Sequence, residues 1–472
     1  MSITSSLNFA TAGLGASSQR AENVARNVAN ADSPGYVRRT SAVGGSGAGL
    51  KVMRDIDPRM VQLRRDAESQ EAGASVAQSF HARLDAEIGD PDTAGSLQDR
   101  LAKLDAAFVS AATSPSSAAA LVNVSRAAAG LAEKLNALDA VVQSSRQEAE
   151  TDIGKTIAQV NADLEGVHRL NVEIAQLGAK GHDMADLIDQ RSLLVDRISQ
   201  QIPVRELARD QDAIALVSKG GILLLDTSPA KLEFNARAPI QADMEAPLDL
   251  GQVELNGKPL RGELYGGGRL GELFAIRDEI APLATERLDS LAGELIGRFG
   301  DPAVDPTLAA GQPGLFTDRG AALDATTPAG LAGRIEVNAL VAPDRPDQHW
   351  RLRDGMAAAA PGTGAETELL LAYGAALADH ARPLGAGLPD IAADMIGHTG
   401  ALRSIISADR LQADDRLSAV ATVAATRGEL RDGGAVDIDS EMRRLIEIEQ
   451  AYAANARVIQ AAGTMIDRLM EI

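Results

Sequence analysis

Residues 3–36 read ITSSLNFATAGLGASSQRAENVARNVANADSPGY, and this stretch decides the fold. Apolar or small residues recur in it at intervals of four, three, four and three, which is the spacing of a coiled-coil seam. The spacing predicts one helix from Ile3 to about Asn30. Pro34-Gly35 ends it, because proline disfavours helix in the residue before it and glycine permits a turn. The residues of this first seam are Ile3, Leu7, Ala10, Leu14, Ser17, Ala21, Val24 and Val28.

The other end of the chain carries a second seam, in which apolar residues fall at every seventh position. Two helices that each present one narrow apolar stripe can bury it against each other or against copies of themselves. Many seam residues are small, which makes a close but weak pair that suits the packing of many copies. We therefore expect the function to be assembly. The residues of the second seam are Ile438, Leu445, Tyr452, Ile459 and Ile466, with Ile448, Ala462 and Leu469 three positions further on.

Composition narrows the class of protein. A chain of 472 residues is too long for one hydrophobic core, so several domains are expected. It contains one Trp, four Tyr and seven Phe, a composition that suits long helices packed through small residues. The formal charge is −20, from 46 basic and 66 acidic residues. Such a surface repels phosphate backbones and anionic lipid, so neither nucleic acid nor a membrane is expected as a partner.

The chain has no cysteine, which excludes disulfides, thiolate catalysis and cysteine-ligated metals. This is compatible with export as an unfolded chain, because no wrong disulfide can form outside the cell. No run approaches the ~18 apolar residues of a membrane span. No Lys or Arg precedes Arg20, so the first residues differ from a cleaved secretory signal. Any export is expected to use a route without such a signal.

Between the two seams the hydrophobic pattern is helical from about Pro58 to Ile202, with breaks at 89–92 and 113–115. After Pro203 the hydrophobic pattern changes: short apolar runs are separated by Gly, Pro and polar residues. These runs predict strands and hairpins at 214–217, 222–225 and 232–234.

Helix is expected again at 270–299 and at 368–430, the latter interrupted from Pro383 to Pro389. Residues 300–365 are rich in Pro, Gly, Asp and Ala and have one strand-like run at 334–338. Residues 40–50 are rich in Gly and Ser and are expected to form a loop or linker.

These patterns predict a mainly α fold: a long antiparallel helical bundle with paired terminal coiled-coil helices and a small β-hairpin insertion. Three domains are expected. The terminal coiled-coil domain is discontinuous and comprises residues 1–50 and 431–472, the helical body comprises 51–202 and 263–430, and the β-rich insertion comprises 203–262.

Motifs for catalysis are weak. Gly266, Gly268 and Gly271 match G-x-G-x-x-G, but the acid that a dinucleotide site needs would fall at 286–289, inside a predicted helix. The six histidines are scattered, and only His182 with Asp183 or Asp186 suggests a ligand pair, short of the three or four ligands of a stable metal site. We expect no enzyme, no cofactor and no metal. A nucleotide-dependent enzyme is the far weaker alternative.

The two ends also resemble a known family. The N-terminal stretch from Asn27 to Arg39 resembles the N-terminal signature of bacterial flagellar rod, hook and hook-associated proteins. The C-terminal stretch VDIDSEM at 436–442, continued by EQAY at 449–452, resembles their C-terminal signature. Within the family, the helical body and the stretch DLIDQRSLL at 186–194 are similar to hook-associated members, as is LGEL at 270–273 followed by Arg277-Asp278.

The resemblance implies a structural protein that forms the junction between hook and filament by polymerising through its terminal helices. It implies secretion by the flagellar type III apparatus to an extracellular position on the flagellum. The implied partners are copies of the chain itself, the hook protein on one side, a second hook-associated junction protein on the other, and an export chaperone at the C-terminal helix. A hook or rod axial protein is the alternative. The short interval after the strand-like run at 334–338 implies that the outer domain of larger relatives is reduced or absent.

The residues expected to make subunit contacts belong to the two seams and to the turn after the first helix. They are Ile3, Leu7, Leu14, Val24, Val28, Asn30, Pro34, Gly35, Tyr36, Ile438, Met442, Leu445, Tyr452, Ile459, Ile466 and Leu469.

Overall fold

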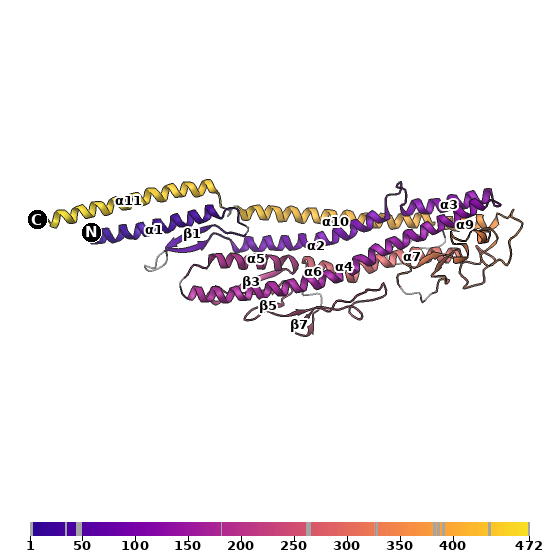
Figure 1. Ribbon diagram of the computed structural model, residues 1–472, viewed down its shortest axis with the longest axis horizontal. Coiled ribbons are helices and arrows are strands. Elements are labelled where there is room, and N and C mark those ends of the chain that lie inside the picture. Colours follow the sequence, from indigo (N-terminus) through magenta and orange to yellow (C-terminus); the bar gives the residue numbers. More distant parts are fainter. Residues whose placement is uncertain are drawn as a thin grey trace.

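The computed structural model shows a long rod in which the terminal helices project together from one end (Figure 1). It describes residues 3–33, 35–43, 50–180, 182–260, 266–324, 326, 329–380, 384, 388, 392–432 and 436–470. Helices dominate and the sheets are small and antiparallel, so the predicted mainly α class is confirmed.

The first half of the body is a set of antiparallel helices that begin where the sequence supplies capping residues. Asp57 caps α2 and precedes a proline at its first turn, and Ser96 and Ser117 cap α3 and α4 with their hydroxyls. Helix α4 has 62 residues and is therefore about 90 Å long at 1.5 Å per residue. The helices are α2 (Pro58–Ile88), α3 (Leu97–Thr113), α4 (Ala118–Ala179) and α5 (Ala185–Gln201).

The β-rich insertion follows at Val204, and the three predicted apolar runs are strands. One three-stranded sheet has the order β3-β4-β5 and the other has the order β6-β7-β8. Both pack along α4 through buried leucines and isoleucines. The strands are β3 (Val204–Ala208), β4 (Ile214–Ser218), β5 (Leu223–Leu225), β6 (Leu232–Glu233), β7 (Glu254–Leu255) and β8 (Lys258–Pro259).

The second half of the body returns along the first. Helix α10 lies along α2, and α9 packs on α3 (Figure 1). Residues 300–365 contain two paired strands, β9 (Phe316–Asp318) and β10 (Ile335–Val337). Strand β10 coincides with the strand-like run predicted at 334–338. The helices are α6 (Gly268–Ala275), a π-helical turn (Ile276–Ile280), α7 (Ala281–Phe299), α8 (Arg351–Asp354), α9 (Glu368–Ala378) and α10 (Met395–Asp432).

A buried polar network ties the insertion to α4. Arg277, in the π-helical turn, is fully buried and pairs with Glu150 of α4 at 2.6 Å. The other oxygen of Glu150 accepts from the backbone N–H of Arg237 at 2.7 Å, and Arg146 donates to the carbonyls of Gln241 and Ala242. Because each of these groups is buried, the network holds the insertion in one position.

Residues 39–54 contradict the expectation of a loop or linker. Strand β1 (Arg39–Val43) pairs antiparallel with β2 (Leu50–Arg54), with Arg39 opposite Arg54 and Ser41 opposite Val52. The Gly-rich residues 44–49 between them lie outside the described residues. A Gly-rich segment with strand-forming residues on both sides, Thr40 and Val43 before it and Leu50 and Val52 after it, is the pattern of a hairpin and was the missed signal.

Candidate assembly surface and its joint with the body

The terminal helices α1 (Ile3–Ala29) and α11 (Ile438–Met470) form an antiparallel pair, which we call the terminal pair (Figure 1). Gly13 lies opposite Asn455, so close that a Cβ at residue 13 would meet the Asn455 amide nitrogen at 2.6 Å. Further along, the side chain of Asn27 reaches Glu441. Glycine at residue 13 therefore leaves room for the Asn455 side chain between the two helices.

Small and polar residues fill the inside of the terminal pair. In α1 the buried row is Ala10, Ser17 and Val24, which are 3%, 5% and 6% exposed. In α11 the buried positions are Glu441 and Ala462. The larger side chains of the two seams lie beside these rows, at the edges of the contact, where they remain open to further partners.

Much of α11 is apolar and exposed. Ile438, Met442 and Tyr452 are 47%, 46% and 49% exposed, and Ile466 is 38% exposed. Burying one such side chain contributes about 1.5–3 kcal/mol, so this row is a strong candidate for contact with another molecule. Other large apolar side chains that are exposed on the terminal pair are Phe9, Ile446, Val458, Met465 and Met470.

The remaining residues predicted for subunit contacts have other environments. Val24 is buried between the helices, whereas Ile3, Leu7, Leu14, Val28, Leu445 and Ile459 are partly buried. Asn30 and Tyr36 lie in and after the turn that ends α1, where both are partly buried. Pro34 and the side chain of Leu469 lie outside the described residues.

The terminal pair meets the body in a polar cluster, which we call the joint: Asn27, Tyr36, Arg38, Arg39, Asp189 and Glu441. Its centre is Asn27, which is 1% exposed and uses all of its hydrogen-bonding capacity. The amide nitrogen donates to the Arg39 carbonyl and to Glu441, both at 3.0 Å. The amide oxygen accepts from the Arg39 backbone N–H at 2.8 Å and from the Tyr36 hydroxyl at 2.9 Å.

Ion pairs made by two arginines complete the joint. Arg38 donates through Nε to Glu441 at 2.8 Å, and Glu441 is 1% exposed. Arg39 pairs with Asp189 of α5 at 2.6 Å and with Asp186 at 2.8 Å. Burial alone would lower the pKa of Arg39, but the hydrogen bond and charge of Asp189 outweigh it and raise that pKa. The joint therefore connects α1, α11 and α5 through buried charges.

Gly35 allows the chain to turn into the joint. Its φ is +78°, and a Cβ there would meet the Leu193 side chain at 2.6 Å. Any other residue would be strained and would also displace Leu193 of α5. The predicted turn at Pro34-Gly35 thus has a packing reason that periodicity alone did not show.

The joint was not predicted as a site, although its residues lie in three stretches that the sequence singles out. Asn27, Arg38 and Arg39 belong to the N-terminal stretch, Asp189 to residues 186–194 and Glu441 to the C-terminal stretch. Asn27 and Glu441 are 414 residues apart in the chain, so no local pattern could show their contact.

Replacing Glu441 with Gln is expected to loosen the terminal pair at the joint. A hydrogen bond to a charged group is worth about 1.5–3 kcal/mol, and Gln cannot accept from Arg38 and Asn27 with two oxygens. Hydrogen exchange of the backbone amides near residues 27 and 441 should become faster, with exchange in α4 unchanged. Glu447→Gln, at an exposed position of the same helix, is the control. Equal exchange in both variants would contradict a clamping role for Glu441.

The residues considered for a nucleotide site or a metal site do not form such a site in the described part of the structure. Residues 286–289 lie inside α7, so no strand presents an acid to a ribose as a dinucleotide site would require. Gly271 is inside α6, and the strand-like residues 263–265 lie outside the described residues. Among the described residues, no group of three His, Asp or Glu side chains could hold a metal ion. In the same part of the chain, no helix has the length and apolarity needed to cross a membrane.

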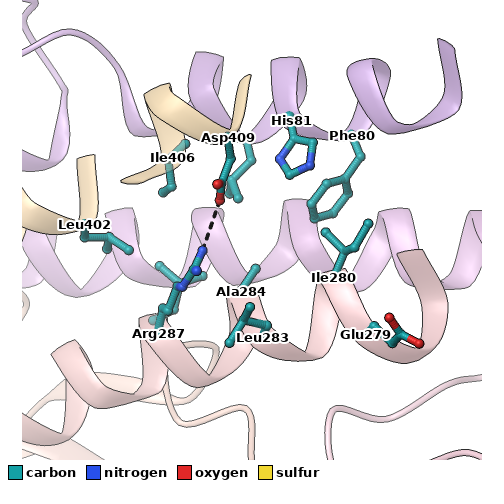
Figure 2. Close-up of a pocket in the computed structure, with 12 residues that line it drawn as sticks. Phe80, His81, Glu279, Ile280, Leu283, Ala284, Arg287, Leu402, Ile406 and Asp409 are labelled. Atoms are coloured by element: carbon teal, nitrogen blue, oxygen red, sulfur yellow. Dashed lines mark hydrogen bonds and ion pairs between the residues drawn. The ribbon is translucent and has the colours of Figure 1, made fainter. Parts of the chain in front are cut away.

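A pocket of about 300 Å³ lies between α2, the π-helical turn, α7 and α10 (Figure 2). Its walls are mostly apolar, and Arg287 pairs across it with Asp409 at 3.1 Å. His81 packs edge-on against Phe80, and burial lowers the pKa of its imidazole. His81 is thus neutral at pH 7, and the charged groups of Arg287 and Asp409 are already paired with each other.

The chain is similar to known flagellar proteins. The family model of the flagellar hook-associated protein FlgK helical domain matches residues 82–312, and the model of the flagellar basal body rod FlgEFG protein C-terminal region matches residues 433–472. The second match contains α11 and Glu441 of the joint, and the first contains α4 and α5.

Relatives with similar sequences are each described as flagellar hook-associated protein 1. The relative from Salmonella typhimurium is 26% identical over 61% of this chain and 55% of its own length. Those from Escherichia coli and Bacillus subtilis are 24% and 22% identical over 61% and 74% of this chain. The chain thus spans about half the length of the Salmonella and Escherichia relatives. The solved structure of the flagellar hook junction protein FlgK from Burkholderia pseudomallei aligns with a TM-score of 0.46 at 20% identity, covering 55% of this chain and 46% of that one.

Proposed function

We propose that this chain, which is similar to flagellar hook-associated protein 1, is a structural protein of the bacterial flagellum that forms the junction between hook and filament. It does so by polymerising through α1 and α11. The observation that carries this proposal is the terminal pair, which fills its inside with small residues and leaves a row of large apolar side chains exposed along α11.

The exposed row suits a helical polymer. Exposing the apolar outer face of a helix pair to water is unfavourable in free energy. Burying the same face between neighbouring copies contributes favourable free energy at every subunit. In the polymer, the terminal pairs pack side by side as an inner tube and the bodies lie outside it. The residues of contact are those predicted from the seams, with Leu445 and Ile459 at the edges of the pair.

The joint gives the polymer its geometry. Buried ion pairs fix the angle between the terminal pair and the body, because each charge would be left without a counter-charge if the helices rotated. The division into a terminal domain of 1–50 and 431–472, a body of 51–202 and 263–430, and an insertion of 203–262 follows this arrangement. The chain acts without catalysis and without a cofactor.

The partners follow from the position of a junction. Copies of the chain contact one another, the hook protein lies on one side and a second hook-associated junction protein on the other. Before assembly, the exposed apolar face of α11 is the surface that an export chaperone would cover. Secretion by the flagellar type III route delivers the chain to the outside of the cell.

Electron microscopy of flagella from a deletion strain tests this proposal. Cells lacking the protein are expected to carry hooks without filaments and to release filament subunits into the medium. Restoring the wild-type chain should restore the filaments. Loss of the hook itself would overturn the junction role and identify the chain as a hook or rod component.

A further inference from the structure

A groove of about 930 Å³ opens at the end of the body that is nearest to the terminal pair. We call it the α5 groove. It lies where the hairpin β1–β2, the end of α4, the start of α5 and the tip of the β3–β4 hairpin meet. The side chains that matter for its chemistry are Met53, Arg54, Ile188, Arg191 and Asp212.

The groove contains more buried positive charge than buried negative charge. Arg191 is 6% exposed, and among the described residues no carboxylate lies within ion-pair distance of it. Neutral or backbone oxygens hold its guanidinium instead: the amide oxygen of Asn171 and the carbonyl of Asp212, both at 2.8 Å. Burying a charge without a counter-charge costs free energy, and an entering anion would recover it.

Arg54 adds to this excess. Its partner is Asp189 at 2.8 Å, but Asp189 is also the partner of Arg39 in the joint. The Nη2 nitrogen of Arg54 is buried and has no acceptor in the described part of the chain. Burial lowers the pKa of Arg54, and burial together with the charge of Arg54 lowers the pKa of Arg191 to about 10. Both groups remain charged at pH 7.

Other charged groups at the groove already have partners or lie in solvent. Asp183 pairs with Arg26 of α1 at 3.2 Å, and Arg209 pairs with Asp226 at 2.9 Å. His182 and Asp212 are exposed. The carboxylate of Glu206, which pairs with Arg65 at 2.5 Å, and the carboxylate of Asp212 stabilise the charge of Arg191 only at a distance. The groove therefore favours a carboxylate that comes from outside.

The position of the groove indicates where that carboxylate comes from. The pair between Asp183 and Arg26 connects its wall to α1, and Arg54 shares Asp189 with the joint, so the groove is continuous with the terminal pair. If copies of the chain pack through their terminal pairs, the terminal helices of a neighbouring copy are the nearest candidates to fill the groove. Helix α11 offers exposed carboxylates at Asp439 and Glu449, on the side of the helix that also carries the exposed Ile446.

We propose that the α5 groove receives the carboxylate-bearing face of α11 from a second copy of this chain, an inference that rests on the proposed polymerisation. The apolar lining, including Met53 and Ile188, packs against apolar side chains of that helix, while Arg54 and Arg191 meet its carboxylates. The groove thus adds a charged contact to the apolar contact between terminal pairs.

Photocrosslinking in assembled flagella tests the occupant. Benzoylphenylalanine in place of Met53, which is 49% exposed in the groove, should crosslink two copies of the chain, with the second attachment between residues 436 and 450. The same probe at Leu207, exposed on β3 and outside the groove, should not. Crosslinks from residue 53 to another protein or to another segment, in flagella that assemble normally, would overturn the inference and leave the junction role intact.

A charge variant tests the chemistry independently. Met53→Glu places a carboxylate at the groove and should reduce the fraction of hooks that carry filaments by about tenfold, because one lost buried charge pair is worth at least about 1.4 kcal/mol. Met53→Gln has nearly the same shape and should assemble like wild type. Equal assembly of all three proteins, or equal loss in both variants, would overturn a role for charge. Failure of the wild-type chain to form a junction would instead contradict the proposed function.

Discussion

Cells that carry Leu445→Asp in place of the wild-type protein are expected to make hooks without filaments, although the variant body folds. Leu445 lies one turn after Glu441 and is partly buried at the edge of the terminal pair. A carboxylate there would have to lose its water when neighbouring copies pack, which costs several kcal/mol per subunit. Every copy in the polymer carries this desolvation cost, so the total free-energy cost grows with the number of subunits.

The body should be unaffected because α11 packs mainly on α1 and lies away from the body helices (Figure 1). Thermal unfolding of the purified variant, followed by circular dichroism, should match wild type in the main transition. Gln450→Asp is the matched control, because it adds the same charge to α11 at an exposed polar position. Filaments of normal number in the Leu445→Asp strain would falsify assembly through this edge of α11.

The second large effect is expected from Glu150→Ala, which should destabilise the body by about 3–5 kcal/mol. Arg277 and Glu150 are both completely buried, so the substitution leaves the guanidinium with Asp278 as its remaining carboxylate partner. It also removes the acceptor for the backbone N–H of Arg237. The insertion loses its attachment to α4 at the same time.

Chemical denaturation of the purified proteins measures this effect. Glu148→Ala is the control: Glu148 is on the same helix, is 58% exposed and pairs with the exposed Arg83, so its loss should cost less than about 1 kcal/mol. Limited proteolysis should also cleave the Glu150→Ala variant faster within residues 203–262. Similar unfolding free energies for the two variants would show that the buried network contributes little.

The long helices could be predicted because their pattern repeats over many turns. Helix α4 keeps its apolar period from Leu121 to Ile174, and Pro203 separates the next helix, α5, from the strands. Each of these signals depends on neighbouring residues in the chain, which is what a sequence displays directly.

The joint and the hairpin β1–β2 could not be predicted in the same way. The hairpin depends on two short strands whose Gly-rich connection has the composition of a linker. The joint depends on contacts between residues hundreds of positions apart, and its members are polar residues that a search for apolar seams passes over. The seams themselves were found, but not which of their rows lies inside: Ala10 and Ala462 are buried, whereas Ile438 and Tyr452 are largely exposed.

The antiparallel pairing of the two ends means that an incomplete chain cannot form the terminal pair. Asn27 meets Glu441 across 414 residues, so α1 lacks its partner helix until nearly the whole chain has been delivered. A chain that is broken or stalled in the middle presents α1 without α11, and its joint lacks Glu441. Such a fragment lacks half of the surface that a growing polymer would recognise. If the terminal pair is the surface of assembly, only a chain delivered to its end would present that surface in full.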